Sequence, residues 1–547
     1  MSIFHLSLYQ DKMSPVIPDH AVCCRQSLSI QPVLIHPAMK TNGNSQLFPI
    51  FHITLFFALG IMTAGCFPQL AAPWMWTAVA LCALCISALL FRHALLQTFF
   101  IFISSFFTGG CMLSVHLSAQ DCCFSSGKTS YRAVVASTSV VHGKVVRCDI
   151  LVTSMQRPVK LKASILRDAN ARMLRPGDGI MAVSAIEKPH NFAGATFDYA
   201  RYMVYHGYSG QTFIYKTGWQ RASADVGKLS LIDRTRLVAM KYRERLLLRY
   251  RQLGLSGDVL AVVSAMTLGA KEDMPKELRE RYSAAGASHI LALSGLHIGI
   301  IYAILSFLFV WRRLRVSGHL LVLSAVWAYV FVTGMPPSAI RSAVMVTIYA
   351  IAVVCFRDRM PLNALSAAAL VMLAFRPSDL FDLGFQMSFM AVFFILVFYG
   401  RIYNNVPAGW RSNVFTRRVW QMTAVSLAAQ AGVAPLVMLC FGRISIYFLL
   451  ANFIVVPVAT IVLYGAMLLF AIPFAPAVQH VSAGLLSLAV SWMNNAVERL
   501  SLLPGGDISG INIHPAQVWM IYALVFVVYG LLRFVRKAVV FGRHDGC

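Results

Sequence analysis

Twelve stretches of this chain are apolar and close to the roughly 20 residues that a helix needs to cross a bilayer. Hydrophobic residues make up 58% of the sequence and charged residues only 13%, which excludes an ordinary soluble globular protein. We therefore predict a polytopic α-helical membrane protein. Its spans are expected at about 48–67, 73–91, 95–117, 288–310, 319–334, 338–356, 361–375, 383–400, 421–440, 446–470, 478–500 and 515–535.

The Lys and Arg residues of the short loops predict the orientation of these spans, because such residues concentrate on the cytoplasmic side. The loops 334–337 and 504–515 carry no Lys or Arg, and alternate loops carry many. The positively charged set is Arg92, Arg312, Arg313, Arg315, Arg357, Arg359, Arg401, Arg411, Arg417, Arg418, Arg533, Arg536, Lys537 and Arg543. An even number of spans then places both termini in the cytoplasm. We expect the protein to lie in the inner (cytoplasmic) membrane.

Residues 118–287 fall outside on this count, and their pattern differs from that of the spans. Val159, Leu161 and Ile165 alternate with Lys160 and Lys162, which is typical of a half-buried strand. Five short strands are expected near 131–140, 145–153, 158–167, 180–186 and 210–215, with a turn at 175–179. Five strands fit a small barrel of the OB type, a fold that often binds oligonucleotides, and fit a generic small barrel equally well.

Charge in this inserted domain favours an anionic partner. Between residues 120 and 220 there are 13 Lys or Arg against six Asp or Glu. A basic barrel with aromatic residues suits single-stranded nucleic acid, whereas a basic face above anionic lipid headgroups is the alternative. The DNA-binding candidates are Arg157, Lys160, Lys162, Arg167, Arg201 and Tyr202. Residues 229–251 mix seven Lys or Arg with apolar residues and are interpreted as a basic collar at the pore mouth.

The segment 286–300 places two histidines, two serines and three glycines in what otherwise has the composition of a spanning helix. Polar groups at membrane depth usually face a bundle interior or a wet path, so they are functional candidates. Gly295 and Gly299 stand four residues apart, a spacing that lets helices approach closely. A packing seam with a hydrogen-bonded His297 is the alternative interpretation.

This segment and several others, taken together, resemble the ComEC-type competence family of DNA-uptake channels. Residues 333–341 are similar to its TGLPPS signature, and residues 361–364 and 380–389 are similar to its PLNAL and FDxGFQLSF pair. Residues 426–435 and 450–457 are similar to its AAQ and LLANLLALP segments, and 191–207 to the stretch that closes the external OB domain. The last stretch departs from the family at Phe192 and by an extra residue before Phe197.

The resemblance implies a channel that passes single-stranded DNA across the cytoplasmic membrane during natural transformation and is not itself an enzyme. Many relatives carry a C-terminal metallo-hydrolase-like domain with an HxHxDH motif, and this sequence contains no HxH. Two alternative functions are also compatible with the sequence. One is a secondary transporter of a small anionic solute with the barrel as a lid. The other is a membrane-embedded hydrolase that uses His289, His297 and Asp382.

A path for DNA through the membrane must be wet and polar, because a ~30 Å hydrocarbon core would hold roughly nine phosphates at ~3.4 Å each. Helix capping and helix–helix hydrogen bonds are the alternative roles for polar residues in spans. We predict a pore-facing role most strongly for His297 and Arg341. The channel-lining candidates are His289, Ser294, Gly295, His297, Gly299, Arg341, Asp382, Gln386, Gln430 and Asn452, with Thr333 and Ser338 beside them.

Other motifs fail. Gly127, Lys128 and Thr129 end like a phosphate-binding loop, but Cys122 stands where its first glycine belongs and a strand follows, so no ATPase is expected. The twelve cysteines lack zinc-site spacing, so neither a metal nor another cofactor is expected. Cys148 could pair with Cys122 or Cys123 in an oxidising compartment, with one thiol left over.

We accordingly divide the chain into a tail, three spans, a barrel, a basic linker, a channel domain and a cytoplasmic tail. The expected partners are single-stranded DNA, the lipid bilayer, and separate proteins that act as DNA receptor, nuclease and cytosolic motor or strand-binding protein. The oligomeric state is left open. The boundaries are 1–46, 47–117, 118–220, 221–287, 288–541 and 542–547, and Met39 is an alternative start.

The orientation can be tested with reporter fusions. A reporter fused after Gly127 should be active outside the cytoplasm, and reporters fused after Arg315, Arg359 or Cys547 should be active inside it, because Lys and Arg mark the cytoplasmic loops. Alkaline phosphatase and fluorescent-protein fusions give opposite signals on the two sides and control for each other. An outside C-terminus would overturn the even number of spans.

Overall fold

The computed structural model describes residues 48–67, 72–120, 124, 127–155, 157–191, 198–272, 274–310, 315–355, 360–472 and 474–544. These residues divide into two compact units. The first takes the described part of Met1–Pro275 together with Ile290–Ser388 and Ala459–Val490. The second takes Lys276–His289, Phe389–Val458 and the chain from Ser491 onward. The predicted channel region 288–541 therefore contributes to both units.

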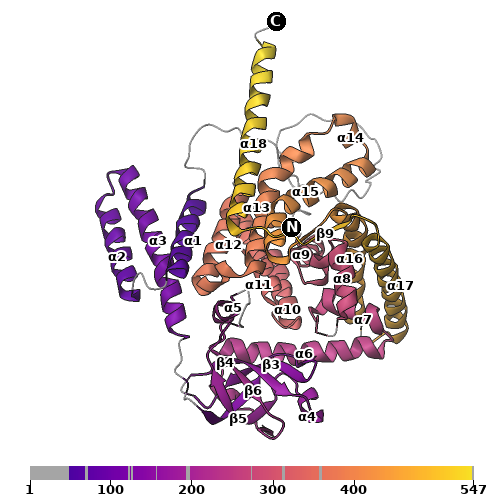
Figure 1. Ribbon diagram of the computed structural model, residues 1–547. Helices are drawn as coiled ribbons and strands as arrows, with labels where there is room; N and C mark the ends of the chain where they lie inside the picture. Colours follow the sequence, from indigo (N-terminus) through magenta and orange to yellow (C-terminus); the bar gives the residue numbers. More distant parts are fainter. Residues whose placement is uncertain are drawn as a thin grey trace. The chain divides into compact units, whose positions relative to one another are not determined.

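Three apolar helices open the first unit (Figure 1): α1 (Pro49–Cys66), α2 (Pro73–Leu89) and α3 (Ala94–Ser118). Proline at the first position of α1 and of α2 removes an N–H that a helix start leaves unpaired anyway. Helices α1 and α3 touch through their backbones. A Cβ at Gly60 would overlap the carbonyl oxygen of Phe106, and one at Gly109 would overlap that of Phe57.

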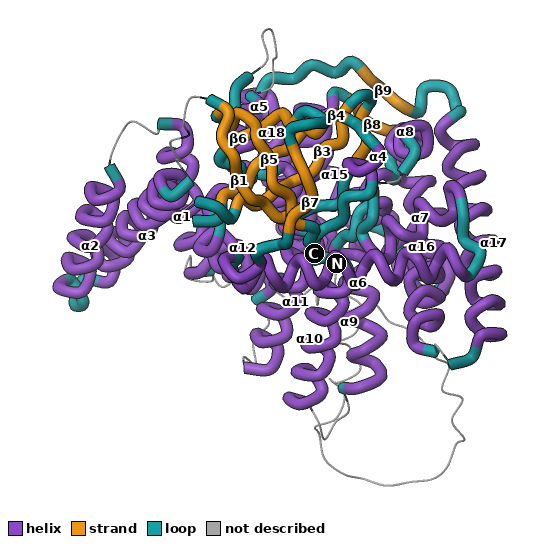
Figure 2. The backbone as a smooth tube through the Cα atoms, turned by 90° about the horizontal axis from the view of Figure 1, so that it is seen from below, coloured by secondary structure: helices purple, strands orange, loops and turns teal. Residues whose placement is uncertain are grey.

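A closed five-stranded barrel follows. The strands β1, β3, β4, β6 and β5 pair in this order, and β5 pairs back with β1; β4 and β6 are parallel and the other ladders antiparallel. Figure 2 shows the strands wound round one another. This is an OB-like barrel. The strands span Lys128–Val135 (β1), Val145–Val152 (β3), Val159–Leu166 (β4), Gly179–Glu187 (β5) and Gly210–Ile214 (β6).

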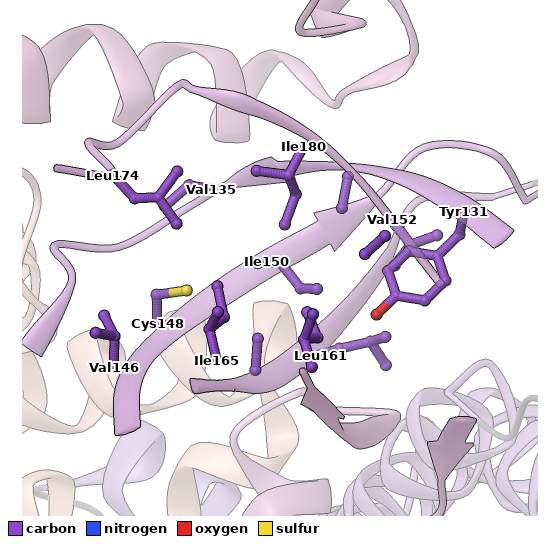
Figure 3. Packing of buried hydrophobic residues seen from close by; sticks show 14 of the residues in the cluster. Tyr131, Val135, Val146, Cys148, Ile150, Val152, Leu161, Ile165, Leu174 and Ile180 are labelled. Carbon is purple, nitrogen blue, oxygen red and sulfur yellow. The ribbon is translucent and has the colours of Figure 1, made fainter. Parts of the chain in front are cut away.

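The alternation expected in β4 is present: Val159, Leu161, Ala163 and Ile165 point inward and the lysines between them do not. Figure 3 shows Leu161 and Ile165 packed with Val146, Ile150 and Ile180. The prediction that β1 reaches residue 140 is wrong, because the strand ends at Val135 and a separate β2 (Val140–His142) pairs with β3. A second strand that was not predicted, β7 (Trp219–Ala222), pairs antiparallel with β5. Short helices α4 (Ala169–Arg172) and α5 (Tyr199–Tyr205) connect the strands.

The basic linker folds as one long helix, α6 (Leu231–Gln252), preceded by a 3₁₀ turn, η1 (Val226–Lys228). Ser230 caps its N-terminus by accepting the backbone N–H of Asp233 at 3.1 Å. Leu237 packs with Leu229 and with Val134 and Leu151 of the barrel, so α6 lies along the barrel. Arg243 is buried and pairs with Glu272 at 2.9 Å and with the Thr138 hydroxyl at 3.0 Å.

The rest of the first unit is helical. Its apolar core joins Ile298, Val326 and Val346 from three neighbouring helices. A tight turn links two of them, in which Gly334 has φ 82° and Met335 φ 55°; the left-handed backbone favours glycine and is unusual for Met335. The elements are α7 (Gly257–Leu268), α9 (Gly295–Phe309), α10 (Arg315–Val332), α11 (Pro337–Cys355), α12 (Pro361–Phe375) and η3 (Pro377–Phe381). The 3₁₀ turn η2 (Ser288–Leu291) begins in the second unit and ends in the first.

The second unit holds α8 (Lys276–Ala284), α14 (Ala408–Ser412), α15 (Val414–Phe441), α18 (Pro515–His544) and the short pair β8 (Arg443–Ser445) and β9 (Asp507–Ser509). Arg443 and Asp507 join the pair through an ion pair of 2.6 Å. Tyr522 of α18 donates to the carbonyl of Gly432 in α15 at 2.7 Å. Helices α13 (Leu383–Asn404), α16 (Phe448–Ala471) and α17 (Pro476–Ser501) run from one unit into the other.

Among the described residues, seven helices are long and apolar enough to cross a membrane: α1, α3, α11, α13, α15, α16 and residues Pro515–Leu532 of α18. Five shorter apolar helices accompany them, including α7, which the sequence reading missed. The predicted span at 288–310 starts late, because α9 begins only at Gly295. The predicted span at 478–500 forms α17, whose Gln479, His480 and Asn494 make it too polar to join the seven.

The contact between α1 and α3 yields a test. Gly60→Ala should destabilise the protein by about 1–3 kcal/mol, because the new methyl group overlaps the backbone of α3 and pushes the helices apart. Thermal unfolding in detergent, followed by loss of the monodisperse chromatographic peak, measures this. Gly484→Ala on α17 is the matched control, since a Cβ there meets nothing within 4 Å. Equal melting temperatures for the two variants would contradict the close contact.

Candidate functional site

Two lysines on the outer face of β4 begin the candidate site. Lys162 donates to Asp149 Oδ1 on the neighbouring strand β3 at 2.8 Å, and the Tyr208 hydroxyl donates to Asp149 Oδ2 at 2.8 Å. Burial alone would raise the pKa of Asp149, but the charges of Lys162 and Lys160 and these hydrogen bonds hold it below its usual value. Asp149 is therefore an ionised carboxylate with both oxygens occupied.

Lys160 is placed differently, although it lies only two residues away on the same strand. Its Nζ lies 3.9 Å from the centre of the Tyr208 ring. Burial, together with the charges of Arg236, Arg376 and Lys162, lowers the pKa of Lys160 to about 8 against the opposing pull of Asp149. Lys160 thus sits in a positive environment that its neighbours do not neutralise.

Helix α5 presents an aromatic face beside these lysines. The ring of Tyr202, which is 43% exposed, stacks at 6.3 Å on Tyr199 and lies 4.0 Å from the ring of His206. Asp198 caps the helix: its Oδ1 accepts the Arg201 backbone N–H and the Asn191 side-chain amide, both at 3.0 Å. Exposed aromatic rings of this kind can stack with nucleic-acid bases.

The same helix contacts the membrane helices of its unit. Arg201 donates to the carbonyl of Gly65 at the end of α1, and its Nε donates to the Tyr205 hydroxyl at 3.0 Å. The Tyr205 ring stacks on Phe381 of η3 at 4.5 Å. The barrel is therefore attached to α1 and η3 through one side of α5.

Asp382 is the centre of this attachment. Its Oδ2 accepts from Arg341 Nη1 of α11 and from the backbone N–H of Phe385, each at 3.1 Å, so it caps α13 as well. Its Oδ1 lies 3.5 Å from His206 Nε2. Burial would raise the pKa of Asp382, but His206 and Arg341 keep it lowered. Arg341 is only 7% exposed, and the structure places it in the first turn of α11.

Two neighbours of Asp382 have defined roles. Gln386 donates to the Leu380 carbonyl at 2.9 Å and so holds the turn between η3 and α13. Gly384 packs against Arg341, and a Cβ there would lie 2.7 Å from Nη2. Of the channel-lining candidates, the structure thus brings Arg341, Asp382 and Gln386 together.

His297 lies at a helix start, and the expectation that segment 286–300 is continuous helix is wrong. Residues Ser288–Leu291 form the 3₁₀ turn η2, and Ser294 caps α9. His297 Nδ1 lies 3.1 Å from the Ser294 backbone nitrogen and 3.0 Å from Ser294 Oγ, forming a capping box. The His297 side chain is 0% exposed. Gly295 faces α11, with Ser342 Oγ 3.4 Å from a Cβ built there, and Gly299 is buried.

The remaining channel-lining candidates belong to the second unit. His289 is exposed at η2, Gln430 is half-buried on α15, and Asn452 of α16 donates to Ser426 Oγ of α15 at 3.3 Å. This hydrogen bond holds two helices together, which is the alternative role expected for such residues.

Thr333, in the first unit, is buried and donates to the Val330 carbonyl at 2.9 Å.

Two DNA-binding candidates lie apart from the cluster. Arg157 is exposed before β4, and Arg167 is exposed after it, where it donates to the Gly143 carbonyl at 3.3 Å. Cys148 is a free thiol, 2% exposed, in the barrel core, and burial raises its pKa to about 12. Cys122 and Cys123 lie outside the described residues. Within the described ranges, no three His, Cys, Asp or Glu residues are grouped to hold a metal ion.

Comparison with known proteins places this geometry in a family. The family model described as "Competence protein" matches residues 266–535, which include α9–α13 and the Arg341–Asp382 pair. Residues 266–535 of the chain belong to the competence protein family. It is 26% identical to "ComE operon protein 3" of Bacillus subtilis (strain 168) over 460 residues, 82% of this chain and 55% of that relative.

A second relative is an "Uncharacterized protein" of Aquifex aeolicus (strain VF5), 28% identical over 197 residues, 36% of this chain and 44% of that protein. The chain spans about half the length of the curated relatives it matches. No solved structure gives a significant match. Two of the segments that resemble the family have clear structural roles. Asp382, Gly384 and Gln386 form the turn before α13, and Asn191 and Asp198 form the start of α5.

The sequence analysis did not name five residues of the cluster: Asp149, His206, Tyr208, Arg236 and Arg376. His206 lies in the stretch 191–207 and Arg236 in the basic segment 229–251, but neither was singled out within them. Asp149 becomes visible only through the β3–β4 register, in which it lies directly opposite Lys162. The other four come from segments that meet only in the folded chain, so no local signal could have identified them.

The two lysines of β4 should respond oppositely to removal. Lys160→Met should raise the melting temperature at pH 7, because it removes a buried charge in a positive environment. The folded pKa, about 8, lies below the ordinary 10.5, so the unfolded chain binds more protons between these values. The gain should therefore be full below pH 8 and fade toward pH 10.5.

Lys162→Met is the matched comparison. It leaves Asp149 Oδ1 without its lysine and should destabilise the protein by about 1–3 kcal/mol at pH 7. Thermal unfolding of both variants across pH 7–10 makes the comparison. Equal destabilisation by both substitutions would show that the two lysines share one environment.

Proposed function

We propose that this protein is a channel of the inner (cytoplasmic) membrane that passes one strand of DNA into the cytosol during natural transformation. Membership of the competence protein family supports this, as does the likeness to "ComE operon protein 3". The barrel supplies a basic and aromatic face suited to a single strand, and the membrane helices supply the route. No reaction at the DNA is part of the proposal.

One observation carries it. The basic face of the barrel and the polar start of α11 and α13 belong to one compact unit and share a series of charged and polar side chains. From Lys162 the series runs through Asp149, Tyr208 and Tyr202 to His206, and then through Asp382 to Arg341. A strand held on the barrel would therefore reach a buried arginine at a helix start without leaving polar surroundings.

Arg341 is the residue we place at the membrane entrance of this route. A phosphate competing with Asp382 for the guanidinium would gain a charge-assisted hydrogen bond as it leaves the barrel. His297 and Ser294 start α9 one helix away, where Gly295 meets Ser342 of α11. We assign to His297 a supporting role at this entrance through the cap of α9, and to Gln430 and Asn452 a role in the route through the second unit.

We further propose that DNA capture, strand degradation and the driving force belong to other proteins. Inward movement of DNA carries negative charge toward a negative interior, at up to ~2.3 kcal/mol per charge at 100 mV. A cytosolic motor or strand-binding proteins that trap the entering DNA can supply this, with both termini of the channel facing them. The orientation follows the distribution of Lys and Arg in the loops.

Uptake of labelled DNA tests the function. In cells lacking the gene, outer capture of DNA should persist and arrival of labelled strand in the cytosol should cease, because only the inner-membrane step is lost. Reintroduced wild-type protein should restore arrival. The double variant Arg341→Gln, Asp382→Asn makes the pair uncharged and should restore far less arrival at equal protein abundance, whereas the exposed control Lys144→Gln should behave as wild type. Undiminished arrival in deletion cells, or joint loss of capture and arrival, would contradict the channel role.

A further inference from the structure

Arg236 on α6 is a cation that the fold leaves unneutralised. Its Nε is buried without a hydrogen-bond partner in the part of the chain that the structure describes. Two other arginines of the same helix have protein acceptors: Arg234 donates to the Leu229 carbonyl at 2.9 Å, and Arg243, whose Nε is likewise unpaired, forms an ion pair with Glu272 through Nη2. A buried guanidinium nitrogen without an acceptor costs stability, so Arg236 is placed to receive an acceptor from outside the chain.

Lys160 faces the same region and is also without a carboxylate of its own. It takes part in none of the ion pairs between described residues, because both oxygens of Asp149 are occupied by Lys162 and Tyr208. Arg236 and Arg376 are close enough to Lys160 for their charges to act on it. Arg376 itself holds only a 3.5 Å contact to Asp379, three residues along the chain.

The charges of the whole cluster do not cancel. Three carboxylates, Asp149, Asp379 and Asp382, face five cations, so a surplus of two positive charges remains before His206 is considered. The cations are Lys160, Lys162, Arg236, Arg341 and Arg376. Like charges gathered in a partly buried region repel one another, and an anionic ligand relieves that repulsion.

We propose that Lys160, Arg236 and Arg376 form a phosphodiester-binding subsite where the barrel meets the membrane helices, and that its ligand is the backbone of single-stranded DNA. The inference rests on the proposed function and deepens it by naming the contacts at which the strand leaves the barrel. Arg236 donates through the nitrogen that now lacks an acceptor, and Arg376 and Lys160 contribute charge.

The neighbouring aromatic face decides between DNA and a lipid headgroup. Tyr202, 43% exposed, lies close enough to Lys162 and Asp382 for their charges to act on its hydroxyl. Its ring stacks on Tyr199 and lies tilted against the ring of His206. Bases have π-faces that stack on such rings, whereas a lipid headgroup brings phosphate without a base. Phosphate contacts and stacking surface at the same place fit a single strand of nucleic acid.

Binding of the DNA phosphate at alkaline pH should then be accompanied by protonation of Lys160. Lys160 is faced by Asp149 of β3, Lys162 of its own strand, Tyr208 before β6, Arg236 of α6 and Arg376 after α12. A phosphate added to this set stabilises the charged ammonium and raises its pKa above about 8. Affinity should therefore fall as pH rises above 8, because the proton must be recovered before the lysine can hold the phosphate.

The test uses the full chain in nanodiscs of uncharged lipid and fluorescein-labelled oligothymidylate, with binding followed by anisotropy over a salt series. Arg236→Gln and Lys160→Gln should each weaken binding about tenfold and reduce the single-strand salt slope by about 0.7, the loss of one phosphate contact. Arg236→Lys keeps the charge and should retain most of the affinity, which also controls for folding. Lys144→Gln, in the exposed turn between β2 and β3, should leave affinity and salt slope near wild type.

The outcomes separate the two proposals. No binding of oligothymidylate by the wild-type protein would count against the proposed function itself. If the wild-type protein binds, and Arg236→Gln and Lys160→Gln both bind as tightly as Lys144→Gln, the subsite is overturned and the channel proposal stands. This result is expected if the three cations instead bind lipid headgroups. Loss of the affinity decline between pH 8 and 9.5 in Lys160→Gln supports the subsite, and persistence of that decline in this variant counts against Lys160 as a phosphate contact.

Discussion

The carboxylate of Asp382 connects elements that would otherwise carry unpaired polar groups at the edge of a membrane. It neutralises Arg341 in α11, accepts a backbone N–H at the start of α13 and lies against His206 after α5. A buried arginine without a counter-ion is expensive, and an uncapped helix start leaves N–H groups unsatisfied where water is scarce. One side chain removes both costs and at the same time attaches the barrel to the helices.

The barrel carries one lysine that is paired and one that is not. Lys162 forms an ion pair with Asp149, whereas Lys160, two residues away, lies near other cations and over the ring of Tyr208. Apolar residues at Lys160 and Arg236 would make the protein more stable, so these cations are retained at a cost in stability. Such departures from the most stable arrangement are expected at sites that bind a ligand.

The segment 286–300 shows why a polar motif in an apolar stretch is easily misread. Its composition suggests a helix with histidines deep in the bilayer, but the chain makes a 3₁₀ turn first and starts α9 at Gly295. His297 then completes a capping box with Ser294, so its Nδ1 serves the start of the helix. Capping and pore-lining both select small and polar residues, and composition alone does not separate them.

Local pattern was enough to predict the apolar spans, five barrel strands and the resemblance to the family, because hydrophobic length, period-two alternation and motif spacing are properties of contiguous residues. It also identified Lys160, Arg341 and Asp382 as candidates. Only the tertiary structure decided which of them meet, that Asp149 serves Lys162 and leaves Lys160 without a partner, and that Arg236 and Arg376 join the same cluster. Ion pairs and unpaired charges depend on strand register and helix packing between distant segments, and no local pattern encodes those distances.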